Sequence, residues 1–79
     1  MSNSILVMKG QKRTTYEGIK AQLDLAFVKM YPNEEYRDDI SFWEDIETSD
    51  TYTWKMDLPD TGKTVFLTYD KNTGEIFKR

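Results

Sequence analysis

The chain has 79 residues and a net charge of −3 at neutral pH, and it contains neither cysteine nor histidine. A chain of this length suffices for one domain with a single small core. The two missing residue types exclude disulfides, thiolate metal sites and histidine-dependent catalysis. We therefore expect a single domain over residues 1–79 with no cofactor.

The first structured segment is expected at residues 5–9, where Ile5 to Lys9 predict a short β-strand. Only four consecutive apolar residues stand there, and no basic segment precedes them. Such a run fits neither a secretory signal nor a membrane span. The sequence therefore favours a cytoplasmic protein that does not cross a membrane.

A helix is predicted next. Thr14 followed three residues later by Glu17 matches a capping box, so the helix should begin near Thr15 and end before Pro32. Gly18 early in the helix costs roughly 1 kcal/mol relative to Ala, so either the helix end frays or the backbone approaches another group closely there. The apolar stripe expected to cover a sheet consists of Tyr16, Ile19, Leu23, Ala26, Phe27 and Met30. The polar positions expected to face solvent are Lys20, Gln22, Asp24 and Lys29.

The middle of the chain has a less definite pattern. Residues 33–39 are polar and acidic and predict a loop. Residues 40–47 fit either an extended segment or a short helical turn. If the segment is extended, we expect Ile40, Phe42 and Ile46 to point inward.

The last third, residues 51–79, predicts three antiparallel strands, because apolar and polar residues alternate between two glycine-containing turns. If Leu58 faces Lys63 across the first turn, Trp54 lies on the face that meets the helix. The helix-side residues expected on this first strand are Tyr52, Trp54, Met56 and Leu58.

The same register places Phe66 and Phe77 on the face away from the helix. Gly62 and Gly74 are expected to have positive φ, since each closes a tight turn. These elements together predict an α+β fold, in which one helix packs on a mostly antiparallel sheet of about four strands in the order β-α-β-β-β.

Charge is unevenly distributed along the chain. Residues 1–20 carry four basic side chains against one acid, whereas residues 24–60 carry eleven acids against three bases, a net charge of −8. A field of that sign repels phosphates and attracts basic partners. The predicted partner-binding residues are Tyr36, Asp38, Asp39, Trp43, Glu44, Asp45, Glu47 and Asp50.

No catalytic or metal-binding motif stands out. Asp60-Thr61-Gly62 is similar to the aspartic-protease triplet, but it lies in a predicted polar turn of a chain too short for that fold. The acids of residues 44–50 lack the spacing of a calcium-binding loop. We interpret them as a solvated acidic surface, with protein recognition as the main alternative.

Part of the chain resembles the PepSY domain. The residues that carry the resemblance are a helix ending in Met30-Tyr31-Pro32, the strand from Tyr52 to Met56, the strand from Val65 to Asp70, and the turn Asn72-Thr73-Gly74-Glu75. It covers roughly residues 17–79. PepSY domains are linked to protease inhibition and regulation, so the resemblance implies a modulator of a peptidase; it implies no catalytic residue.

Three functions therefore follow from the sequence. The favoured one is a non-enzymatic inhibitor or adaptor of the kind that a bacteriophage or mobile element encodes. It would present its acidic segment to a basic host protein, with Tyr36 and Trp43 as aromatic anchors. The second is PepSY-like modulation of a peptidase. The third is nucleic-acid binding through Lys9, Lys12, Arg13 and the sheet aromatics, which the acidic middle of the chain disfavours.

Overall fold

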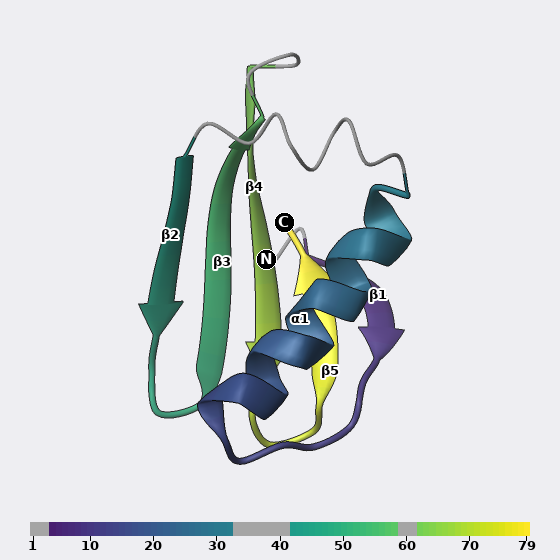
Figure 1. Cartoon of the computed structure of the whole chain (residues 1–79), viewed down its shortest axis with the longest axis vertical. Helices are drawn as coiled ribbons and strands as arrows, with labels where there is room; N and C mark the ends of the chain where they lie inside the picture. The colour runs from purple at the N-terminus through teal and green to yellow at the C-terminus, as the bar shows by residue number, and fades with distance from the viewer. Residues whose placement is uncertain (1–3, 33–41, 59–61) are drawn as a thin grey trace.

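The computed structural model describes residues 4–32, 42–58 and 62–79. These residues form one helix and five strands. In chain order the elements are β1 (Ile5–Lys9), α1 (Tyr16–Met30), β2 (Phe42–Glu47), β3 (Thr51–Leu58), β4 (Lys63–Asp70) and β5 (Glu75–Lys78). All strands join in one antiparallel sheet of order β1-β5-β4-β3-β2, with β1 and β2 at its two edges (Figure 1).

The α+β class is confirmed, but the sheet has five strands where the sequence predicted about four, and the element order is β-α-β-β-β-β. The additional strand is β2. It lies in the segment for which the sequence left a helical turn as an alternative to an extended conformation. It pairs with β3 in unbroken register along its whole length. A tight turn joins the two strands, in which the Thr48 N–H donates to the Thr51 carbonyl at 2.9 Å. Pairing with a neighbouring strand, which the local sequence pattern does not encode, makes this segment extended.

The predicted register of the last three strands is confirmed. The Cα atoms of Leu58 and Lys63 are partners, as are those of Trp54 and Leu67. This register follows from a regular alternation that places one apolar set on one side of the sheet. Phe77 pairs with Thr68 and lies on the side away from α1, as expected.

Both turn glycines have the predicted backbone conformation, with φ of 64° at Gly62 and 81° at Gly74. Gly74 also has a packing role. The Gly10 N–H donates to the Gly74 carbonyl at 2.9 Å, and a Cβ added at Gly74 would lie 2.8 Å from the Gly10 carbonyl oxygen. The turn between β4 and β5 therefore packs directly against the chain that leads from β1 to α1.

Helix α1 begins one residue later than the predicted capping box. Thr15 is the N-cap, and its side chain accepts a hydrogen bond from the Gly18 N–H at 3.1 Å, so the Thr14–Glu17 box does not form the cap. Of the two alternatives at Gly18, the structure shows the close approach, because an added Cβ would lie 2.9 Å from the Thr15 Oγ1. No helix in the described ranges has the length and apolar character that a membrane span requires.

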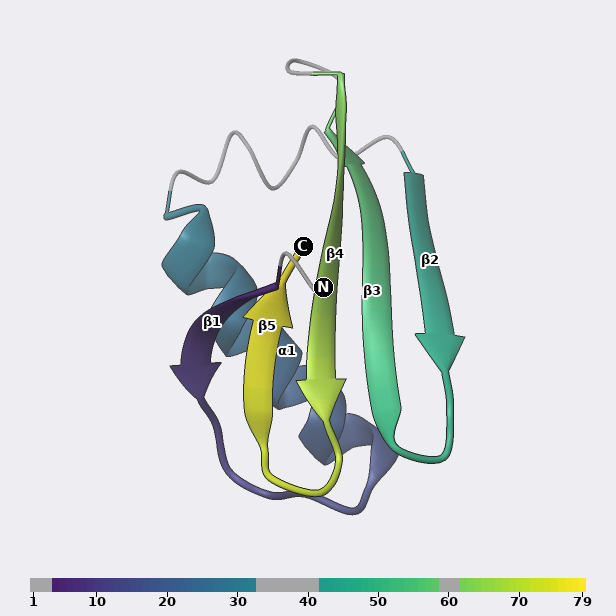
Figure 2. The ribbon, with the colours of Figure 1, turned by 180° about the vertical axis from the view of Figure 1, so that it is seen from behind.

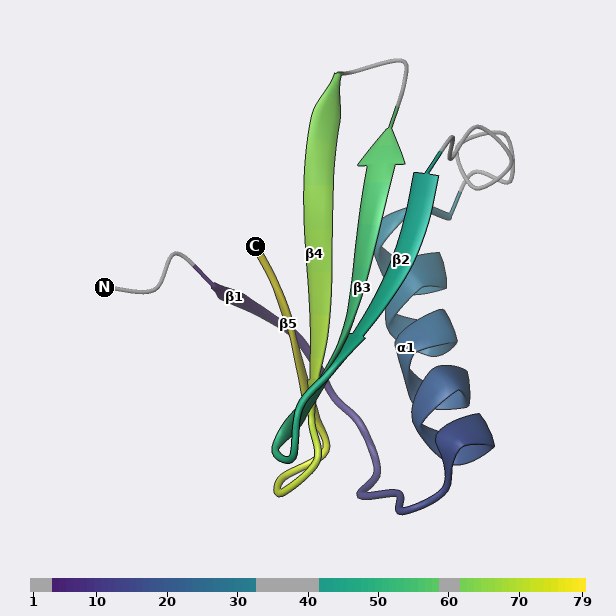
Figure 3. The same ribbon diagram turned by 90° about the vertical axis from the view of Figure 1, so that its left-hand side faces the viewer.

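The core lies between α1 and one face of the sheet, and the helix covers that face alone (Figure 3). Its buried apolar residues are Ile19, Leu23, Ala26, Phe27, Tyr52, Trp54, Met56, Val65, Leu67, Tyr69 and Ile76. Tyr16, which the sequence placed in the buried stripe, is 49% exposed. It stands in the first turn of α1, and its hydroxyl donates to the exposed Asp45 at 3.2 Å.

Gln22 corrects a second expectation. It was predicted to face solvent, but it is buried, and its Oε1 accepts a hydrogen bond from the Gln11 N–H at 2.8 Å. The hydroxyl of Tyr69 makes a similar link: it accepts from the Arg13 N–H at 2.7 Å and donates to the Gln11 carbonyl at 2.8 Å. Buried polar groups from helix and sheet therefore hold the segment between β1 and α1 in place.

The opposite face of the sheet is not covered by α1 (Figure 2). Phe66 and Phe77 are half-buried there. Ile46, expected to point inward, is 38% exposed, because its partner in β3 is Thr53 and both lie on this uncovered face. Ile40 and the side chain of Phe42, which shared that prediction, lie outside the described part of the structure.

Candidate functional site

Strand β2 carries most of the predicted site that the structure describes. It forms one edge of the sheet, at the left of Figure 1. Asp45 pairs with Trp54 and Glu47 pairs with Tyr52, so both acids lie on the side of α1. Glu44 pairs with Lys55 and therefore lies on the uncovered face. We call Glu44, Asp45 and Glu47, with Asp50 in the following turn, the acidic edge. All four side chains are exposed.

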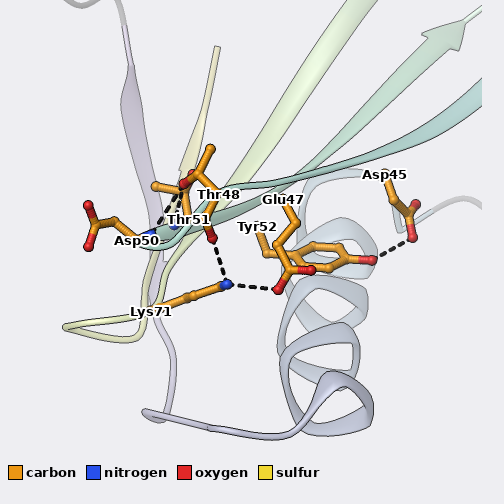
Figure 4. Close-up of polar contacts among 7 residues, drawn as sticks. All are labelled: Asp45, Glu47, Thr48, Asp50, Thr51, Tyr52 and Lys71. Carbon is orange, nitrogen blue, oxygen red and sulfur yellow. Dashed lines mark hydrogen bonds and ion pairs between the residues drawn. The ribbon is translucent and has the colours of Figure 1, made fainter.

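Asp45 is held by two tyrosines. Its Oδ2 accepts hydrogen bonds from the Tyr52 hydroxyl at 2.5 Å, shown in Figure 4, and from the Tyr16 hydroxyl at 3.2 Å. The two rings meet edge to face, with centroids 5.7 Å apart. Burial, followed by the hydrogen bond to Asp45, raises the pKa of Tyr52 above its ordinary value. Asp45 therefore has a defined position, although it lies on the outermost strand.

Glu47 forms an ion pair. The Lys71 Nζ lies 2.7 Å from the Glu47 Oε2 and donates a second bond of 2.7 Å to the Thr48 carbonyl (Figure 4). The Lys71 side chain is 21% exposed and that of Glu47 is 58% exposed. Lys71 offsets part of the negative charge at this end of β2, so Asp45 contributes more than Glu47 to the field along the strand.

The turn after β2 is ordered by its own hydroxyls. The Thr48 Oγ1 accepts from the Thr51 N–H at 2.9 Å and lies 2.7 Å from the Thr51 Oγ1. The Asn72 amide donates to the Asp50 Oδ1 at 3.4 Å, which connects this turn with the one between β4 and β5. The acidic edge is thus attached to the rest of the sheet at both Asp45 and Asp50.

The remaining predicted site residues lie wholly or partly outside the described structure. Tyr36, Asp38 and Asp39 lie outside the described residues, as does the side chain of Trp43. The backbone of Trp43 belongs to β2.

Sequence reasoning missed Lys71, Tyr16 and Tyr52 as partners of the acids. For Lys71 a signal existed. The predicted register of β3 and β4, continued past Thr51 and Asp70, places Lys71 opposite Asp50. The Lys71 N–H does donate to the Asp50 carbonyl, at 2.8 Å.

A second feature is a hollow of about 500 Å³ on the uncovered face. It is lined by Ser4, Ile46, Thr51, Thr53, Phe66, Thr68, Phe77 and Arg79. The Arg79 guanidinium lies over the Phe66 ring, 4.6 Å from its centroid. The hollow thus combines aromatic and apolar groups with threonine hydroxyls, and Ile46 connects it with the acidic edge.

Neither region has the arrangement of a metal centre. Within residues 4–32, 42–58 and 62–79, no group of three or more acidic side chains gathers closely enough to hold a metal ion. Comparison of the chain with family models, curated proteins and solved structures finds no match. The resemblance to PepSY domains therefore stays a prediction.

Proposed function

We propose that this protein is a non-enzymatic binding domain that recognises a basic protein through the acidic edge and acts as a stoichiometric inhibitor or adaptor. The observation that carries the proposal is the position of the acids. Glu44, Asp45 and Glu47 are exposed on both sides of one edge strand. A cluster of one sign on a rigid support attracts a partner of opposite charge and orients its approach.

The support is ordered because contacts within the described structure hold β2 at Asp45 and at the turn that follows Glu47. Asp45 is bound by a buried tyrosine, and the turn after Glu47 is bound to the β4–β5 turn. Ordering the site before binding reduces the conformational entropy that a complex loses. The same negative field opposes the phosphates of nucleic acid, which ranks the nucleic-acid alternative below protein recognition.

The test compares two triple variants with the same change in net charge. The first neutralises the edge with Glu44→Gln, Asp45→Asn and Glu47→Gln. The second neutralises acids on other elements with Glu17→Gln, Asp24→Asn and Glu75→Gln. Asn at position 45 keeps an oxygen that can accept from Tyr52, so the first variant should remain folded.

The parent protein is used to capture partners from a bacterial lysate, and the partner is then titrated with all three proteins at low and moderate salt. We expect the edge variant to bind more weakly and with a flatter salt dependence, since attraction is screened over roughly 10 Å at 0.1 M salt. The control variant should bind like the parent.

Equal affinity and salt slope for the two variants would contradict the proposal. Tight binding of the parent to a single-stranded oligonucleotide, lost after neutralising Lys9, Lys12 and Arg13, would instead support the nucleic-acid function.

Single substitutions test how much each acid of the acidic edge contributes to binding. Because Lys71 already pairs with Glu47, neutralising Asp45 should weaken binding more than neutralising Glu47. The reverse order would show that the partner displaces Lys71 and binds Glu47 directly.

A further inference from the structure

The outer side of β2 presents backbone hydrogen-bonding groups as well as charge. The Thr48 N–H bonds to the Thr51 carbonyl, so Thr48 directs its main chain toward β3. In an antiparallel pair, residues alternate between directing their N–H and C=O toward the partner strand and away from it. By this alternation Ile46 and Glu44 point their main chains toward β3, whereas Asp45 and Glu47 point theirs away from the sheet.

Hydrogen bonding on the other side of β3, toward β4, leads independently to the same assignment of inward and outward main-chain groups. The Lys71 N–H bonds to the Asp50 carbonyl, so Asp50 and Tyr52 direct their main chains toward β4. Thr53, which lies between Tyr52 and Trp54, therefore directs its main chain toward β2 and its partner Ile46. Two hydrogen bonds on different sides of β3 thus agree that the N–H and C=O groups of Asp45 and Glu47 face outward.

The two edges of the sheet differ in how they are protected against further pairing. The register of β1 is interrupted by a bulge between Leu6 and Met8, whereas β2 keeps unbroken register with β3. Bulges and charged side chains are among the common means of blocking an edge strand. Of these two, the described strand β2 has only the charges, and all three are negative. They disfavour pairing with the β2 of a second copy, because like charges would stand opposite one another.

We propose that β2 accepts an extended basic segment of the partner protein as an antiparallel sixth strand, with main-chain hydrogen bonds to Asp45 and Glu47. This inference rests on the proposed function and specifies its binding mode. Strand addition of this kind uses the backbone for affinity and alternate side chains for specificity.

The register also specifies the sequence pattern of the segment. Residues that pair directly with Asp45 and Glu47 place their side chains on the side of α1, next to those two carboxylates, and should be Lys or Arg. Residues between them place their side chains on the uncovered face. There Ile46 is 38% exposed at the rim of the hollow, which suits an apolar side chain. The expected ligand therefore alternates basic and apolar residues.

The test uses the full chain and capped synthetic peptides of about eight residues, the length of an ordinary strand. The parent peptide alternates lysine and valine. One derivative is N-methylated at the central lysines, whose N–H groups should bond to β2, and the other at the central valines, whose N–H groups should face solvent. The two derivatives have identical composition and charge, and a peptide alternating glutamate and valine tests the sign of the charge.

We expect the parent and valine-methylated peptides to bind alike, and the lysine-methylated peptide to bind at least roughly tenfold more weakly, because it loses backbone hydrogen bonds. Hydrogen exchange gives a second measurement. Saturation with the parent peptide should slow exchange at the Asp45 and Glu47 amides, and should change little at Glu44 and Ile46, which already bond to β3.

Equal binding of both methylated peptides would overturn strand addition while leaving the acidic edge as an electrostatic site, so the proposed function would stand. Strand addition would also be overturned if the lysine–valine peptide did not bind, or if the glutamate–valine peptide bound equally well. Slow exchange at Asp45 and Glu47 in a dimer of the free protein would identify a second copy as the occupant. The variant titration with the captured partner decides the proposed function separately.

Discussion

The two faces of the sheet differ in how completely they are buried. Under α1, Trp54 is 4% exposed and Tyr69 is fully buried, whereas on the opposite face Phe66 and Phe77 are only half-buried and Ile46 is 38% exposed. One face thus forms a closed core, and the other face, with the edge β2, contacts solvent. We therefore expect substitutions in the core to change stability and substitutions at the edge to change binding.

The sharpest test of this difference is Trp54→Ala, matched with Thr53→Ala on the opposite face. Truncating a buried tryptophan costs about 3–5 kcal/mol, which is most of the stability of a small domain. Thr53 loses only a half-buried hydroxyl contact of 2.9 Å with Thr68, so its variant should lose about 1 kcal/mol. Urea unfolding followed by circular dichroism measures both. A Trp54→Ala protein as stable as the Thr53 variant would show that the core is elsewhere.

The two turn glycines offer a second comparison. At Gly62 no described atom lies within 4 Å of an added Cβ, so Gly62→Ala should cost about 1 kcal/mol for its positive φ alone. At Gly74 the new Cβ would also meet backbone atoms of Gly10, Gln11 and Lys12 within 2.9 Å. Gly74→Ala should therefore cost about 2 kcal/mol or more, since the backbone must move. Equal melting temperatures for the two variants would contradict the close packing of this turn.

Tyr52 connects the core with the acidic edge, and replacing it should change how stability depends on pH. Burial raises the pKa of Tyr52, and that of Tyr31, above the ordinary value of 10.0. Above pH 10 the unfolded chain releases these protons more readily than the folded chain does. The stability due to each tyrosine is thus complete below pH 10 and decreases above it, by about 1.4 kcal/mol per pH unit for a group that stays protonated when folded.

Tyr52→Phe should cost about 1 kcal/mol at neutral pH, for the lost bond to Asp45, and should flatten the alkaline decrease in stability. Tyr31 should account for the part of the decrease that remains. Chemical unfolding at a series of pH values from 8 to about 11 compares parent and variant. Parallel curves would show that Tyr52 ionises equally easily in the folded and unfolded chains.

The sequence predicted most of the fold where structure depends on local pattern. The helix, the register of β3 with β4, and the positive φ at Gly62 and Gly74 follow from spacing, alternation and turn chemistry. Strand β2 does not follow, because Phe-Trp-Glu-Asp-Ile-Glu lacks a regular alternation and becomes extended by pairing with β3. Gln22 was predicted wrongly for a similar reason: its burial depends on the backbone of Gln11, a contact that helical periodicity does not report.

The candidate site was likewise predicted from the sequence only in part. Charge counting located the acidic segment, but it did not separate Glu44 from Asp45 and Glu47, which lie on different sides of β2. That separation requires the register between strands. The tyrosine that binds Asp45 is likewise identified only by the fold, because the alternation assigns Tyr52 to the core, whereas its hydroxyl bonds at the core boundary.

The smallest expected effect concerns the ion pair between Glu47 and Lys71. Its coupling energy can be compared directly with the cost of truncating a core residue. Exposed ion pairs contribute about 0.2–1 kcal/mol, because water and salt weaken the attraction. A double-mutant cycle with Glu47→Gln and Lys71→Met should give a coupling energy in that range, and the coupling should decrease with added salt. Lys71→Met should destabilise more than Glu47→Gln, since Lys71 also donates to the Thr48 carbonyl. A coupling energy near the cost of Trp54→Ala would mean that the edge, like the core, holds the fold together, and its charges would then not be free to serve binding alone.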